Sequence, residues 1–331
     1  MRHDVPVGEL RDLPKAHLHL HLTGGMRPTT LVALAEEQGR RLPPDLLSAA
    51  DVDATALRGW AKFQRLYDAA RVLLVGPAEV QRVVREIVED QAEAGVRWLE
   101  LQVDPSSYAA RLGGLHAAVE CVLEALQNDL GVGTGLVLAG NRTRHPSETE
   151  TLARLARQFE GVVGLGLSND ETRGDTRDFE KAFRLARDAG LISVPHAGEL
   201  RGAGSVQLAV ERLGATRLGH GVRAVEDPQL LELLADLSVC CEVNPVSNVS
   251  LHVHASVAEN PWRALRAAGV PVAIGADDPL LFRASLLDNY AVLDASDAEL
   301  ADLARCSITS STAPADLQVE LLAGIDAWLT A

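Results

Sequence analysis

Short apolar segments alternate with longer amphipathic stretches along most of the chain. The amphipathic stretches, such as 80–95 and 178–190, repeat their apolar residues with helical spacing. The segments with the pattern of buried strands are 15–22, 96–104, 133–140, 161–168, 191–198, 216–222, 237–245 and 269–278. Strands that alternate with helices predict βαβ units and a parallel sheet. Eight such units favour an α/β fold of the closed (β/α)8 TIM barrel type, with a doubly wound open sheet as the alternative.

One connection is much longer than the others. Between residues 28 and 75, the stretches TLVALAEEQG and FQRLYDAARVLL have helical spacing. We therefore expect a helical insertion after the first strand, suited to covering a site at that end of the barrel. Nothing in the composition resembles an interdomain linker, so residues 1–331 are predicted to form a single barrel domain.

Charge and cysteine content narrow the class of protein. The formal net charge of −15 disfavours nucleic acid and anionic membranes as partners, since both are bound through basic patches. The cysteines Cys121, Cys240, Cys241 and Cys306 include no CxxC pair, so neither a disulfide framework nor a cysteine zinc site is indicated. The N-terminus lacks the apolar region of a secretory signal and no apolar run is of membrane-spanning length, so a cytoplasmic location is expected.

Three alternating histidines, His17, His19 and His21, lie on the first predicted strand. Side chains two residues apart on a strand share a face, so all three are expected to point the same way. Two neighbours of the three can meet on one ion, whereas His17 and His21 are about twice as far apart. Imidazole suits zinc, copper, iron or nickel, so this motif does not by itself name a metal. A strand with a polar face is the alternative.

Further polar side chains stand where other predicted strands end. They are His196 and Glu199 in HAGE, His220 in LGHG, and the adjacent carboxylates Asp277 and Asp278. Each motif alone also fits an ordinary strand end or helix cap. In a barrel, however, the ends of strands one, five, six and eight lie on one rim, where active sites are built. Together they predict a metal site with a carboxylate that transfers protons.

The motifs PKAHLHLHLTG, HAGE, LGHG, NPVSN and ADDPLLF occur in this order between about 13 and 325. In these motifs the chain resembles the adenosine deaminase family of metal-dependent hydrolases. The resemblance implies a (β/α)8 barrel that holds one Zn²⁺ per chain. Carried over position by position, it implies His19, His21, His196 and Asp277 as the zinc ligands.

The resemblance also implies roles around the substrate. Glu199, when protonated, would donate to purine N1, and His220 would orient the water that the metal activates. Asp278 would be the partner of purine N7, and Asn169 stands where the family usually has a glycine whose backbone N–H meets N3. The expected reaction is hydrolytic deamination at C6 of an adenine nucleoside, by an aminohydrolase.

Departures from the family pattern bear on the substrate. Thr23 replaces a carboxylate that accepts the ribose 5′-hydroxyl, and Arg27 follows close behind. We interpret this change as suited to a small-molecule adenine nucleoside with an anionic 5′ substituent, bound by Thr23 and Arg27, although a solvent-facing Arg27 is the alternative. A similar branch of the family acts on 6-amino-6-deoxyfutalosine in menaquinone biosynthesis, which makes that nucleoside the leading substrate and adenosine or 2′-deoxyadenosine the alternative. Gly166 stands where the family commonly has Asp, and its effect is not predicted.

Other classes stay open at this point. The chain could be a non-catalytic nucleoside-binding barrel, or a barrel hydrolase that acts on another C–N bond. Retention of Glu199 beside four ligand positions argues against the first, and the absence of a barrel lysine placed to bridge two metals argues against binuclear hydrolases. His252 and His254 are a less favoured second metal pair. The sequence does not predict the oligomeric state.

Overall fold

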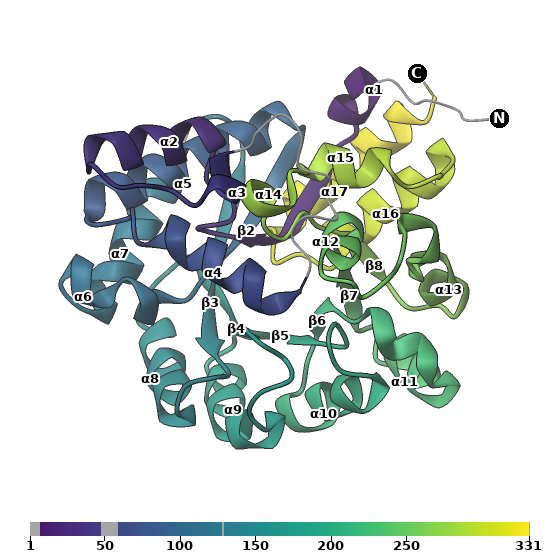
Figure 1. The fold of residues 1–331 in the computed structure, drawn as a ribbon. Coiled ribbons are helices and arrows are strands. Elements are labelled where there is room, and N and C mark those ends of the chain that lie inside the picture. The colour runs from purple at the N-terminus through teal and green to yellow at the C-terminus, as the bar shows by residue number, and fades with distance from the viewer. Residues whose placement is uncertain (1–6, 48–58, 128, 331) are drawn as a thin grey trace.

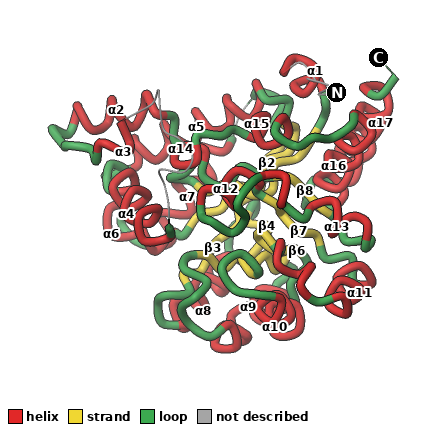
Figure 2. Tube along the Cα trace, turned by 45° about the vertical axis from the view of Figure 1, so that its right-hand side comes forward, coloured by secondary structure: helices red, strands yellow, loops and turns green. Residues whose placement is uncertain are grey.

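The computed structural model describes residues 7–47, 59–127 and 129–330. Eight parallel strands follow one another in sequence order around a barrel, and helices surround them (Figures 1 and 2). The strands are β1 (Lys15–His21), β2 (Val96–Val103), β3 (Gly133–Asn141), β4 (Val162–Ser168), β5 (Ile192–Ala197), β6 (Arg217–His220), β7 (Cys240–Val243) and β8 (Val272–Ile274). The predicted TIM barrel is confirmed, and the open sheet is wrong.

The barrel closes between its first and last strands. An isolated parallel bridge joins Leu20 to Asp277, and the backbone N–H of His21 donates to the Asp277 carbonyl at 3.1 Å. The last strands are shorter than their predicted ranges, because residues such as Asp277 leave the regular ladder at the rim where the site is built.

Helices surround the barrel, and some of them, such as α4 (Trp60–Arg71), lie across its rim. The helices are α1 (Val7–Asp12), α2 (Pro28–Glu37), α3 (Pro44–Leu47), α4 (Trp60–Arg71), α5 (Pro77–Glu93), α6 (Ala109–Leu112), α7 (Leu115–Leu126), α8 (Pro146–Ala156), α9 (Glu180–Asp188), α10 (Ala203–Leu213), α11 (Pro228–Asp236), α12 (Pro245–Ser250), α13 (Trp262–Ala267), α14 (Pro279–Phe282), α15 (Leu286–Ala291), α16 (Asp297–Thr309) and α17 (Ala315–Trp328). Within the described residues, no helix is long and apolar enough to cross a membrane.

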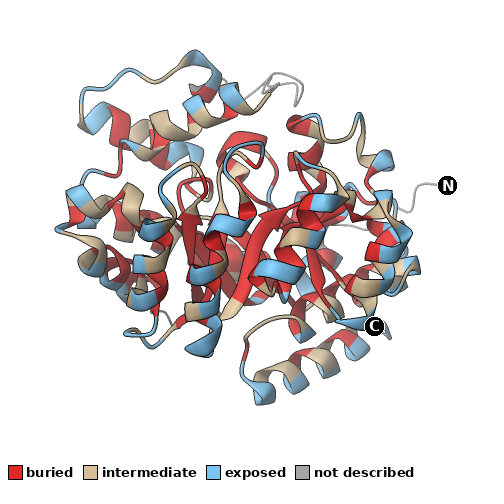
Figure 3. Ribbon diagram, turned by 90° about the horizontal axis from the view of Figure 1, so that it is seen from below, coloured by how far each residue is buried: buried red, intermediate tan, exposed pale blue. Residues whose placement is uncertain are grey.

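Helix α5 illustrates why these stretches form helices. Pro77 stands in its first turn, where the missing N–H costs no hydrogen bond. Val80, Val83, Val84 and Ile87 repeat at helical spacing and are all buried, so one apolar stripe packs against the strands. In Figure 3 the strands are almost entirely buried, while the exposed residues gather on the outer helices.

The predicted helical insertion is confirmed. Helices α2, α3 and α4 all precede α5, and α4 lies across the rim of the barrel in Figure 1. Trp60, Phe63 and Tyr67 of α4 line the cavity at this rim. The ring of Phe63 stacks on Phe282 of α14 with 5.2 Å between centroids, which ties the insertion to the segment after β8.

The expectation that all three β1 histidines share a face is wrong. The pairing of β1 with β2 shifts register between His17 and Leu20, and such a shift moves side chains to the opposite face. His17 pairs with Leu99, whereas His21 pairs with Gln102. His17 therefore meets helix α5, where its Nδ1 lies 2.8 Å from Gln91 Oε1. Burial lowers the pKa of His17 to about 4.

Candidate metal and substrate site

Four side chains predicted as metal ligands converge at the carboxyl ends of the strands. His21 Nε2 lies 3.2 Å from His196 Nε2 and 3.3 Å from Asp277 Oδ1. His19 Nε2 lies 3.3 Å from the same Asp277 oxygen. The strands β1 and β5 and the turn after β8 thus bring together residues that are far apart in the chain.

The arrangement fits one tetrahedral divalent ion. Zinc–nitrogen and zinc–oxygen bonds of about 2.0–2.1 Å place neighbouring ligand atoms about 3.3–3.4 Å apart, close to the separations found here. His19 Nε2 is buried and has no hydrogen-bond partner among the described residues, which is costly unless an ion takes that place. The ligand-type atoms of His19, His196, His220 and Asp277 form one buried group, and His21 forms a second group with Asp277 and Asp278. Three imidazoles and one carboxylate suit a single metal such as zinc.

The Nδ1 side of the His19 ring contacts a series of buried charged side chains. Its Nδ1 lies 2.9 Å from Glu242 Oε2, and Arg217 Nε lies 2.8 Å from the other Glu242 oxygen. Arg217 also pairs with Glu100. A carboxylate behind a ligand histidine fixes the ring orientation and its tautomer. Sequence analysis missed Glu242, although a lone acid inside the apolar strand CCEV is a signal of such a role.

The motif NPVSN supports the other ligands. The Ser247 hydroxyl donates to Asp277 Oδ2 at 2.5 Å, and Asn248 Nδ2 donates to His220 Nδ1 at 3.1 Å. His220 Nδ1 is therefore an acceptor, and its Nε2 carries the proton and faces Glu199 Oε1 at 3.5 Å. His220 lies in the same cluster, 4.0 Å from Asp277 Oδ2. Burial lowers the pKa of His220 to about 3.

Three residues of the site have left-handed backbones. His220 has φ +66°, Asp277 +60° and Asn169 +78°. This conformation is strained for residues other than glycine and is frequent at functional sites. Asn169 stands where the family usually has glycine, and asparagine tolerates this conformation better than most residues. The replacement therefore keeps a backbone that glycine would also adopt.

Glu199 follows the ligand His196 and is almost completely buried. Burial, and then the charges of Asp277 and Glu171, raise its pKa well above the usual value. A buried carboxyl with a raised pKa is suited to hold and deliver a proton. Burial and then Asp277 likewise raise the pKa of the neighbouring Asp278.

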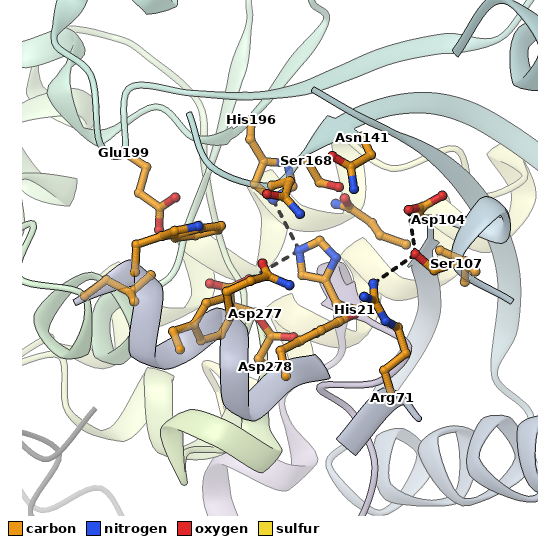
Figure 4. A pocket seen from close by; sticks show the side chains of 18 of the residues that line it. His21, Arg71, Asp104, Ser107, Asn141, Ser168, His196, Glu199, Asp277 and Asp278 are labelled. Atoms are coloured by element: carbon orange, nitrogen blue, oxygen red, sulfur yellow. Dashed lines mark hydrogen bonds and ion pairs between the residues drawn. The ribbon is translucent and has the colours of Figure 1, made fainter. Parts of the chain in front are cut away.

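A cavity opens over this cluster, and it is lined by residues of β1, β5 and the turn after β8. Figure 4 shows His21, His196 and Asp277 converging, with Glu199 on one side and Arg71 on the other. The lining residues predicted from the sequence are His21, Asn169, His196, Glu199, His220, Asp277 and Asp278. Those that the sequence analysis missed include Trp60, Phe63, Tyr67, Arg71, Gln102, Asp104, Ser107, Tyr108 and Asn141.

The two residues predicted to bind the 5′ side of the substrate do not line the cavity. Thr23 is buried behind Tyr108, and their hydroxyls are 2.7 Å apart. Arg27 turns to helix α5, where its guanidinium pairs with Asp90 at 2.7 Å and Glu89 at 2.9 Å. These carboxylates neutralise Arg27, so its prediction as an anion-binding residue is corrected.

Arg71 is the arginine that reaches the cavity instead. Its Nη1 donates to Ser107 Oγ at 2.9 Å, and its Nη2 pairs with Asp68 at 2.5 Å. The Ser107 hydroxyl donates in turn to Asp104 Oδ2 at 2.8 Å, as Figure 4 shows. The rim thus carries an ordered network of charges at the end away from the metal ligands.

The remaining positions singled out in the sequence lie outside the metal cluster. In the described part of the chain, neither His252 nor His254 belongs to a group of ligand-type side chains. Both line a separate hollow beside Arg223. Gly166 faces tight packing, since an added Cβ would lie 3.3 Å from the Val194 carbonyl oxygen.

Comparisons with known proteins match nearly the whole chain to one family. A family model described as adenosine deaminase matches residues 14–328. A putative adenosine/adenine deaminase of Streptomyces coelicolor is 52% identical, covering 98% of this chain and 99% of that protein. An adenine deaminase of Chelativorans sp. is 35% identical, covering 85% of this chain and 86% of that protein.

Solved structures agree in the same way. The crystal structure of an adenine deaminase from Arthrobacter aurescens has a TM-score of 0.87 and 31% identity, covering 96% of this chain and 99% of that chain. The N6-methyl-AMP deaminase of Arabidopsis thaliana has a TM-score of 0.83 and 26% identity, covering 97% and 98%. The protein is an aminohydrolase, and with this barrel, cluster and matched length it belongs to the adenosine deaminase family.

Proposed function

We propose that the protein catalyses the metal-dependent hydrolytic removal of the 6-amino group from adenosine or adenine, with release of ammonia. The observation that carries this proposal is the cluster of His19, His21, His196 and Asp277. All of these except His19 line one cavity together with the buried Glu199. The relatives named for adenosine and adenine support the substrate class.

The roles of the side chains follow from their protonation. His19, His21, His196 and Asp277 would hold the zinc ion, whose contribution would be to make water nucleophilic toward C6 near neutral pH. Glu199, whose raised pKa favours the protonated form, donates its proton to purine N1 and makes C6 more electrophilic. His220, with Nε2–H facing Glu199, orients the attacking water.

The base is held by groups on the other side of the cavity. Asp278 lines the cavity, and its raised pKa favours a protonated carboxyl that donates to the N7 lone pair. The left-handed backbone of Asn169 allows its N–H to meet N3. These two contacts recognise the adenine ring through hydrogen bonds from uncharged groups.

A second candidate substrate is 6-amino-6-deoxyfutalosine, an adenine nucleoside with a benzoate at its 5′ end. One observation favours it: the guanidinium of Arg71, which also pairs with Asp68, lines the cavity on the side away from Glu199. The named relatives favour adenosine or adenine over this compound. A comparison of kcat/KM for the three substrates on one preparation decides between the candidates.

The test uses the ultraviolet shift from adenine to hypoxanthine. The zinc-loaded protein is expected to give this shift with adenosine or adenine, and Glu199→Gln is expected to keep its zinc while losing nearly all turnover. An absence of product with every adenine compound contradicts the proposed function. Near-normal turnover in Glu199→Gln removes Glu199 as the proton donor.

A further inference from the structure

Gln102 is a buried polar side chain that the proposed mechanism does not use. Its residue is 1% exposed, and it lines the cavity. Among the residues that the structure describes, neither its Nε2 nor its Oε1 has a hydrogen-bond partner. The buried carboxamide of this cavity-lining residue therefore has one donor group and one acceptor unused.

The position of Gln102 follows from strand alternation. Glu100 and Gln102 of β2 are two residues apart and share the face that points into the barrel, where Glu100 pairs with Arg217. Gln102 pairs with the ligand His21 in the register of β1 and β2. Its side chain therefore lies on the strand next to β1, at the same height in the barrel as His21.

An unpartnered buried amide is costly. A buried group that makes no hydrogen bond has lost its contacts with water and gained nothing in return. Another buried glutamine of this chain, Gln91, avoids that cost by contacting His17 at 2.8 Å. A carboxamide left open in a cavity is therefore expected to be satisfied by what the cavity binds.

We propose that Gln102 binds the sugar of a nucleoside substrate. This inference rests on the proposed function, in which Glu199, Asp278 and the Asn169 backbone take N1, N7 and N3 of the base. Apart from the 6-amino group, which is the group removed, the hydrogen-bonding groups of a nucleoside that remain belong to its sugar. Each sugar hydroxyl donates and accepts. A carboxamide offers the complementary acceptor and donor side by side.

The side chains around Gln102 favour an uncharged group of the substrate as its hydrogen-bond partner. Asn141 and Ser168, on the next two strands, line the same cavity and carry no charge. The Asn141 Oδ1 accepts from the Thr143 backbone and hydroxyl, which leaves its Nδ2 for the cavity. The wall beside Gln102 thus offers neutral donors and acceptors, as a sugar requires.

The experiment compares Gln102→Leu with the wild-type zinc enzyme on adenosine and on adenine. We expect kcat/KM for adenosine to fall about 10- to 100-fold, through KM more than kcat, and kcat/KM for adenine to change less than about twofold. The thermal midpoint is expected to rise, because leucine removes the unpartnered amide. Gln38→Leu, a partly buried glutamine outside the cavity, is the matched control.

Each other outcome overturns the inference. Equal losses on both substrates show that Gln102 contacts the base, and unchanged kinetics on both show that it contacts no substrate. Turnover of adenine alone by the wild type also contradicts a nucleoside-binding Gln102. Failure of the proposed function is distinct, since the wild type would then deaminate neither compound. If Gln102→Leu does not fold, Gln102→Met serves with the same expectations.

Discussion

The carboxylate of Glu171 accepts the backbone N–H of Glu199 at 2.9 Å. The same carboxylate also accepts the N–H groups of Gly198, Leu200 and Arg201 at 2.6–3.0 Å. A buried anion held by successive backbone donors fixes that stretch of chain firmly. The loop after β5 is thus shaped around Glu171, and the position of Glu199, the proposed proton donor, depends on a side chain from the loop after β4.

The substitution Glu171→Gln tests this dependence. An amide keeps the size but replaces one accepting oxygen by a donor that faces backbone N–H groups. We expect kcat to fall about 10- to 100-fold with little change in KM or zinc content, since the loss of about two charge-assisted hydrogen bonds costs this much. Steady-state kinetics and metal analysis measure the result.

The control for Glu171→Gln is Glu232→Gln, the same change at an exposed position of α11. Faster hydrogen exchange of the amides at 198–201 in Glu171→Gln alone supports a positioning role. A normal kcat, or a parallel loss of zinc, contradicts it.

Glu242→Gln tests the support behind His19. Loss of the carboxylate at His19 Nδ1 makes the imidazole less basic and so a weaker metal ligand. It also removes one of the carboxylates that pair with Arg217. We expect zinc affinity to fall about 10- to 100-fold. Competition with a chromogenic chelator measures the affinity. Unchanged affinity would show that Glu242 serves only to balance Arg217.

Arg27→Ala tests the corrected place of that residue. Its ion pairs with Asp90 and Glu89 are partly exposed, and the Arg27 side chain itself is 31% exposed. We expect the free energy of unfolding to fall by about 1 kcal/mol or less, with kcat/KM within about twofold for every substrate. A selective loss on a substrate with a 5′ anion restores Arg27 as a recognition residue. Arg71→Ala, at the cavity, is the comparison.

Lys15 makes the stability depend on pH. Its ammonium is buried against the Leu10 and Ala94 carbonyls, and burial lowers its pKa from 10.5 to about 7. Between these two pKa values the unfolded chain binds more protons than the folded protein, so stability rises with pH. We expect a gain of about 2 kcal/mol between pH 7 and pH 9. Urea unfolding of the wild type and Lys15→Met measures it, and equal pH slopes for both contradict the assignment.

The sequence predicted most of what depends on local pattern. Alternating strands and helices predicted the barrel, and motifs at strand ends predicted the converging His19, His196 and Asp277. What it missed depends on pairing between distant segments. The register shift in β1 directs the His17 side chain away from the metal cluster. The ion pair with Asp90 holds the Arg27 side chain away from the cavity. No spacing along the chain carries that information.

Asp277 closes the barrel against β1 and also belongs to the metal cluster. During synthesis, β1 with its two ligands leaves the ribosome early, whereas Asp277 arrives near the end of the chain. The full set of ligands therefore exists only after the last strand has docked. An ion that needs all of these side chains would therefore bind late in folding, and it would link the first and last strands where the barrel closes.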